Sequence, residues 1–112
     1  MQEISWEDFE KVDIRVGKVI EAEPFPEARK PSMKLTVDFG PGVGARNTSA
    51  QLTVHYAPEE LLGRQVVAVV NFPSKRIAGF KSEVLVLGVP DSEGAVVLLT
   101  PDRKVPLGGK MF

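Results

Sequence analysis

The sequence contains no cysteine and only one histidine, His55. Without thiols the chain can form no disulfide, offer no thiolate to a metal and supply no cysteine nucleophile. A single histidine is too little for the usual protein zinc site, and it would have to serve every base role in a hydrolytic triad. We therefore expect no catalytic residue, no metal site and no cofactor, and we predict that the protein is not an enzyme.

The charges nearly cancel and no long apolar run is present. Lysine and arginine number 14, aspartate and glutamate 15, and the formal net charge is -1. This balance argues against general polyanion binding, although it leaves room for a local basic patch.

The chain begins with acidic Met1-Gln2-Glu3, where a signal peptide would be basic, and no apolar segment is long enough to span a membrane. We expect one domain over residues 1–112, located in the cytoplasm and not inserted in a membrane.

Short alternating segments separated by proline and glycine predict a small all-β barrel. Ser5, with Asp8 three residues later, suits the start of a short helix in an N-terminal extension, residues 1–10. Pro58 and Gly63 bound a second helix of one turn. The glycines of 40–44 are not followed by the Gly-Lys-Ser/Thr of a phosphate loop, so no ATP site is expected. We predict strands at 11–22, 33–39, 49–56, 66–70, 84–89 and 95–99, with the second helix between the third and the fourth.

The run 71–88 combines strand ends with a basic and aromatic connection. It follows the apolar strand 66–70 and contains Pro73, Gly79, two phenylalanines and three cations. A rigid strand that leads into such a loop is a common way to present a binding surface. The alternative is a solvated hairpin whose lysines only prevent edge-to-edge pairing.

Two motifs make the chain resemble the tRNA-binding-domain family. The first is Asp13-Ile14-Arg15-Val16-Gly17-Lys18-Val19, and the second is the run from Asn71 to Gly88. Within the family, the stretches 25–29, 49–51 and 71–88 are similar to those of small export-related chaperones. The resemblance covers nearly the whole chain. It implies an OB-fold, which is a partly open five-stranded barrel, and a homodimer.

Strands 66–70 and 84–87 are apolar at every position, although a barrel strand normally buries one face only. Outward-facing valines and leucines of this number would expose a patch of the size that marks an interface. We expect them to pack against a second copy of the chain. The alternative is that the flanking segments 1–10 and 101–112 cover them within one chain. The predicted dimer interface comprises Trp6, Phe9, Val67, Val69, Leu85 and Leu87.

The resemblance implies two functions that share one surface. The first is an ATP-independent chaperone for unfolded or precursor polypeptides, in contact with the export machinery. Its expected apolar contacts are Phe72, Pro73, Ile77 and Phe80, with Lys75, Arg76 and Lys81 at the rim.

The second function is binding of tRNA, in which cations contact phosphates and a hydroxyl contacts a ribose or base. In this family the tRNA binders usually carry methionine where this chain has Leu85, and a small residue where it has Val84. These departures weaken the second alternative. Its expected residues are Arg15, Lys75, Arg76, Lys81, Ser82 and Leu85.

Overall fold

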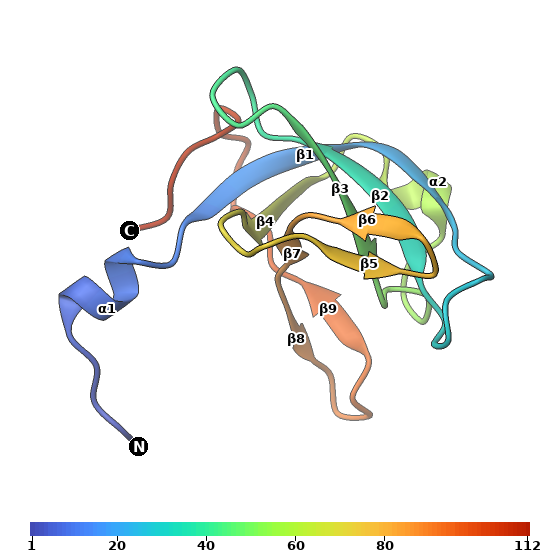
Figure 1. Ribbon diagram of the computed structural model, residues 1–112, viewed down its shortest axis with the longest axis horizontal. Helices are drawn as coiled ribbons and strands as arrows, with labels where there is room; N and C mark the ends of the chain where they lie inside the picture. The colour runs from blue at the N-terminus through green and yellow to red at the C-terminus, as the bar shows by residue number, and fades with distance from the viewer.

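The computed structural model describes all residues, 1–112, and shows a five-stranded barrel with two small helices (Figure 1). The main sheet has the order β3-β2-β1-β4-β7, and β5–β6 and β8–β9 form two-stranded sheets. This confirms the predicted OB-fold. The elements are α1 (Trp6–Glu10), β1 (Ile14–Pro24), β2 (Met33–Asp38), β3 (Ala45–Ala50), α2 (Pro58–Leu61), β4 (Gln65–Val69), β5 (Lys75–Ile77), β6 (Phe80–Ser82), β7 (Leu85–Val86), β8 (Gly88–Pro90) and β9 (Val96–Leu98).

The core lies inside the barrel and is built from alternate strand residues. On β2, Met33, Leu35 and Val37 are buried, whereas the residues between them are only partly covered. The β1 strand pairs with β4 through its first half and with β2 through its second half, and a bulge between Val19 and Glu21 bends it. Because a bulge increases the local twist, β1 can serve both neighbours while the sheet curls closed.

Gly17 lies where β1 approaches the core most closely. A Cβ atom on Gly17 would lie 2.5 Å from Val37 Cγ1 and 2.8 Å from the Phe39 ring. Any other residue would force these fully buried side chains to move, so the position requires glycine for space rather than for backbone freedom.

A seam of side-chain and backbone hydrogen bonds closes the barrel between β3 and residues 82–84. The Glu83 N–H donates to the Asn47 carbonyl at 2.8 Å, and the Thr48 hydroxyl donates to the Val84 carbonyl at 2.7 Å. The Ser49 N–H donates to the Ser82 hydroxyl at 3.1 Å. The seam therefore fixes the chain that leaves the β5–β6 hairpin against β3.

Three predicted strands were wrong in extent, and the first of them, 11–22, is Ile14–Pro24 in the structure. The third strand is Ala45–Ala50, not 49–56, because pairing with β2 ends where Ala50 faces Met33 and the chain then turns. The predicted strand 84–89 is divided at Leu87, since β7 pairs with β4 and β8 pairs with β9. The N-terminal helix is confirmed, including its capping box between Ser5 and Asp8.

Both faces of β4 are buried within one chain, which corrects the expectation that its outward valines are exposed. Val66 and Ala68 belong to the barrel core, whereas Val67 and Val69 form a second cluster with Ile14 on the outside of the barrel. Phe9 of α1 packs on this outer cluster, as does Leu87. The flanking segment 1–10 thus covers part of β4, as the alternative interpretation predicted.

Asn71 holds the residues just before β1, and the C-terminal segment is hydrogen-bonded to β1 itself. The Asn71 amide accepts from the Asp13 N–H at 3.0 Å and donates to the Lys11 carbonyl at 2.7 Å. On the other edge of β1, the Gly108 N–H donates to the Val16 carbonyl and the Met111 N–H to the Ile14 carbonyl. The C-terminus therefore lies beside α1 (Figure 1). Neither helix is long and apolar enough to cross a membrane.

Candidate functional site: a groove beside the β5–β6 hairpin

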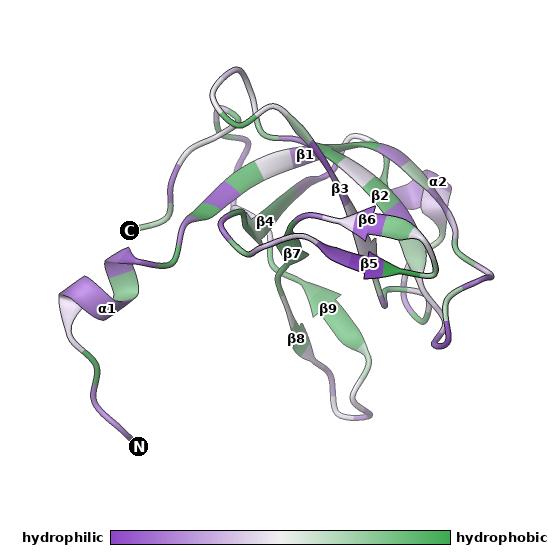
Figure 2. Cartoon of the chain, viewed as in Figure 1, coloured by the Kyte–Doolittle hydropathy of each residue, from purple (hydrophilic) through white to green (hydrophobic).

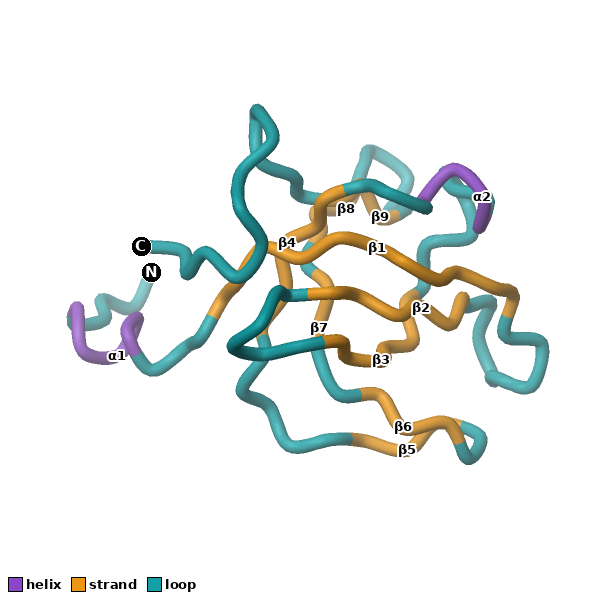
Figure 3. The backbone as a smooth tube through the Cα atoms, turned by 90° about the horizontal axis from the view of Figure 1, so that it is seen from above, coloured by secondary structure: helices purple, strands orange, loops and turns teal.

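Within the run 71–88, residues 75–82 form a β-hairpin that lies beside β3, set off from the main sheet (Figure 3). Ala78 and Gly79 connect its strands with φ of 47° and 81°. Two successive residues with positive φ are typical of a type I′ turn, whose twist matches that of the strands. Opposite residues share a face, so the register Ile77↔Phe80 and Lys75↔Ser82 puts these four side chains on one face. Arg76 and Lys81 share the other, exposed face.

A groove of about 780 Å³ runs between this hairpin and the end of β3. One wall is made by consecutive residues 75–78, the opposite wall by 49–52, and the loop after β1 adds residues 27–30 and Ser32. A smaller cavity of about 360 Å³ adjoins it and adds Phe72 and Pro73. The two share Ser49, Lys75, Ile77 and Leu85. The apolar side chains that line the groove are Ala28, Ala50, Leu52, Ile77, Ala78, Leu85, Val86 and Val96.

The groove carries a local positive charge on a protein that is nearly neutral. Four cations line it, and Glu27 is the only acid among the lining residues. The local formal charge is thus +3, compared with -1 for the whole chain. Apolar walls with a cationic border suit an occupant that is itself apolar in part and acidic in part. The four cations are Arg29, Lys30, Lys75 and Arg76.

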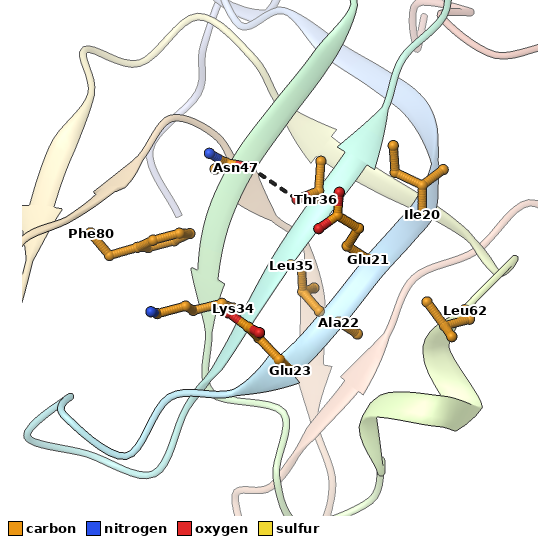
Figure 4. Close-up of a pocket in the computed structure, with 10 residues that line it drawn as sticks. All are labelled: Ile20, Glu21, Ala22, Glu23, Lys34, Leu35, Thr36, Asn47, Leu62 and Phe80. Carbon is orange, nitrogen blue, oxygen red and sulfur yellow. Dashed lines mark hydrogen bonds between the residues drawn. The ribbon is translucent and has the colours of Figure 1, made fainter.

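From β6, which does not line the groove, Phe80 anchors the hairpin to the barrel. The Phe80 and Phe25 rings are 5.5 Å apart and nearly perpendicular, and the Lys34 ammonium lies 4.8 Å from the centre of the Phe25 ring and 5.2 Å from that of Phe80. An edge-to-face aromatic pair with a cation over both rings is a favourable contact. Phe80 also borders a separate pocket of about 500 Å³ over β1 and β2, whose polar residues include Glu21 and Thr36 (Figure 4).

The predicted binding residues of the run 71–88 lie in four places: the groove, the adjoining cavity, the pocket beside Phe80 and the outer face of the hairpin. Lys75 and Ile77 lie in the groove, and Phe72, which is 54% exposed, lies in the adjoining cavity with Pro73 and Leu85. Phe80 borders the other pocket. Lys81 faces solvent on the outer face of the hairpin beside Arg76.

Two predicted tRNA contacts have partners inside the chain. The Ser82 hydroxyl accepts the Ser49 N–H in the barrel seam. The Arg15 guanidinium donates to both carboxylate oxygens of Asp13, at 2.8 and 3.3 Å, and to the Gly108 carbonyl at 3.0 Å. These bonds fasten the C-terminal segment to β1, so the motif residues Asp13 and Arg15 have a structural role here.

The predicted dimer residues fall into two layers. Val67 and Val69 are 9% and 5% exposed, so little of their surface is left for a partner. Trp6 is 81% exposed, and Leu85 is 49% exposed. Phe9 and Leu87 lie between these extremes and cover the buried valines.

Sequence reasoning missed several residues of the groove. Arg29 and Lys30 stand in a proline-rich stretch that predicts only a connection, and the alternation in 49–56 predicts Leu52 inside a strand. Val86 and Val96 were interpreted as ordinary strand residues. Arg29 lies in the segment 25–29, which carries part of the family resemblance, and this position could have indicated a role in binding.

The chain belongs to the tRNA-binding-domain family. The model of the family described as "Putative tRNA binding domain" matches residues 14–110. The predicted membership is thus confirmed.

Among solved structures, the chaperone CsaA from Bacillus anthracis is 54% identical, with a TM-score of 0.91 over 99% of this chain and 100% of that one. The CsaA chaperone from Picrophilus torridus is 50% identical, with a TM-score of 0.90 over 98% of this chain and 100% of that one. The predicted similarity to a small chaperone of the family is therefore confirmed as well.

Curated relatives include much longer enzymes. The methionine–tRNA ligase of Porphyromonas gingivalis is 37% identical over 98% of this chain, and that of Pyrococcus furiosus is 41% identical over 99%. The chain spans only 16% and 15% of the lengths of these ligases. It corresponds to a domain of the tRNA-binding type in those proteins.

Proposed function

We propose that this protein is a passive chaperone that holds unfolded or precursor polypeptides in the groove beside the β5–β6 hairpin. The observation that carries the proposal is the combination of apolar walls and a cationic border in one open groove of about 780 Å³. Unfolded chains expose both apolar and charged side chains, so a groove of mixed character can hold many of them. The likeness to CsaA chaperones at 50–54% identity supports the same assignment.

Holding of this kind needs no nucleotide and no catalysis. Since the sequence contains no phosphate-binding loop, we propose binding without ATP, cofactor or chemical step. A cytoplasmic protein of this type would keep precursors unfolded until the export machinery takes them over. Release would then follow from the affinity of the next partner rather than from energy spent by the holder.

We also propose that the protein acts as a homodimer through its outer apolar face. Val89 lies opposite Val97, and the Leu99 N–H donates to the Leu87 carbonyl, so these four residues form an apolar stripe on one face of β8–β9. Figure 2 shows the hydrophobic colour along both strands. Leu87 and Phe9 join this stripe, across the outer cluster on β4, to a cavity of about 480 Å³ that is lined by Trp6, Val12, Met111 and Phe112.

A continuous apolar face of this kind is unusual on a monomer and suits a self-complementary interface. Two grooves on one rigid dimer would let a single unfolded chain bind twice, which raises its apparent affinity without better contacts.

Binding of tRNA is the second candidate. The family match favours it, as does the pairing of Arg76 with Lys81 on the exposed face of the hairpin, where neither cation forms an ion pair with a carboxylate. Phe72 is exposed nearby in sequence and offers a ring for base stacking. On a near-neutral protein we expect such binding to be sensitive to salt.

The chaperone function is tested by Ile77→Glu. A carboxylate in the groove wall removes apolar contact with the client, so suppression of aggregation of a chemically unfolded reporter should require at least about tenfold more protein. The matched control is Ile20→Glu, which changes an isoleucine of β1 that is 42% exposed and lines the separate pocket beside Phe80. If both variants protect the reporter like the parent protein, with unchanged circular dichroism, the groove is not the binding site.

The dimer is tested by Val97→Lys, which puts a charge in the centre of the apolar stripe. Light scattering should give the mass of a dimer for the parent protein and of a monomer for this variant. Val54→Lys is the control, because Val54 is 74% exposed but lies in the loop before α2, outside the stripe. A parent protein that stays monomeric as its concentration rises contradicts the proposal.

The tRNA alternative is tested by Lys81→Glu. If the outer face of the hairpin contacts phosphates, tRNA affinity should fall and the slope of its logarithm against that of salt concentration should decrease by about 1. Lys104→Glu makes the same charge change on the C-terminal segment and should have little effect. Equal losses in the two variants would mean that tRNA responds only to net charge.

A further inference from the structure

The β5 strand has a free edge, and that edge borders the groove. The β5–β6 sheet has only two strands, so β5 pairs on one side alone. Four consecutive residues, 75–78, line the groove, although alternate side chains point to opposite faces of the hairpin. Because residues from both faces of the hairpin line the groove, the groove must follow the edge of β5, where the backbone groups lie.

The turn sets which backbone groups are free. In a hairpin with a two-residue loop, the residues that flank the loop exchange hydrogen bonds, and the next pair turns its N–H and C=O groups outward. Here Ile77 and Phe80 flank the loop, and Arg76 and Lys81 are the next pair. The N–H and C=O of Arg76 therefore point away from β6 and are available to an added strand.

We propose that the polypeptide client is held as an extended strand added antiparallel to the edge of β5, with apolar side chains toward the groove and acidic side chains on the outer face. This inference rests on the proposed chaperone function and specifies how the same groove recognises its client. Backbone pairing gives affinity that is independent of sequence, which suits a holder of many unfolded chains.

The faces of the hairpin determine the preferred pattern of the client. A client residue opposite Arg76 has its side chain on the face of Arg76, where a carboxylate would form a cross-strand ion pair. Its neighbours in the client point to the other face, beside Ile77 and Val86. The occupant with the best fit alternates apolar residues with glutamate or aspartate.

The lining favours a polypeptide over single-stranded RNA in this groove. None of the residues that line it is aromatic, and the walls are aliphatic. Sequence-tolerant binding of single strands depends on stacking of bases on aromatic rings. Free strand edges, in contrast, pair with another polypeptide backbone.

The test uses a capped peptide of alternating valine and glutamate, and two versions that are N-methylated at every glutamate or at every valine. In an antiparallel pair the glutamate opposite Arg76 donates its own N–H to the Arg76 carbonyl, so methylation at glutamate removes that donor and should weaken binding by about tenfold or more. Methylation at valine should leave the affinity near that of the parent peptide. All three peptides have the same side chains and the same charge. A shift of the strand pairing by two residues puts another methylated residue opposite Arg76, so it does not restore the lost donor. The readout is fluorescence anisotropy with the full-length protein.

Equal affinity of the three peptides would overturn strand addition, and a greater loss on methylation at valine would overturn the antiparallel pairing with Arg76. If the parent peptide fails to bind while the protein still protects an unfolded reporter, strand addition is wrong and the chaperone function stands. If neither peptide nor reporter is bound, both proposals fail. Displacement of the peptide by an oligouridylate at physiological salt would overturn the assignment of the groove to polypeptide.

Discussion

The seam between β3 and residues 82–84 is the interaction on which the rest of the structure depends. A five-stranded barrel must join its first and last strands, and here β3 meets the chain after β6 through only a few hydrogen bonds. The Thr48 hydroxyl reaches the Val84 carbonyl at 2.7 Å in a buried position, where loss of the donor would leave an unpaired carbonyl. Because residues 82–84 also end the hairpin, the bonds that close the barrel also place the hairpin beside β3.

The hairpin in turn creates two surfaces of different character. On one side Phe80 stacks against Phe25 beneath the Lys34 ammonium, which holds the hairpin over the barrel. On the other side the free edge of β5 faces the end of β3 across the groove. Binding and anchoring are therefore divided between the strands of one hairpin, which explains how a small rigid barrel can present an open and adaptable groove.

The sequence predicts the barrel well and the site only in part. Alternation in 33–39 and the capping box of Ser5 and Asp8 are local patterns, so they identify β2 and α1 directly. The strand Ala45–Ala50 has no such pattern and depends on pairing with β2. Likewise, a motif cannot tell that Ser82 closes the seam, that Arg15 fastens the C-terminal segment or that Phe80 packs on Phe25 outside the groove. These roles depend on register and on contacts between distant segments, as does the contribution of Arg29 to the groove.

The central claim is that an unfolded polypeptide occupies the groove between β5 and the end of β3. Amide chemical-shift mapping tests it most directly, with the isotopically labelled protein and an unlabelled, permanently unfolded client at physiological salt. If the groove holds the client, the largest shifts should fall on 75–78, 49–52 and the loop 27–30. Shifts centred instead on Glu21, Thr36 and the rest of the pocket beside Phe80, with the groove unchanged, would contradict it.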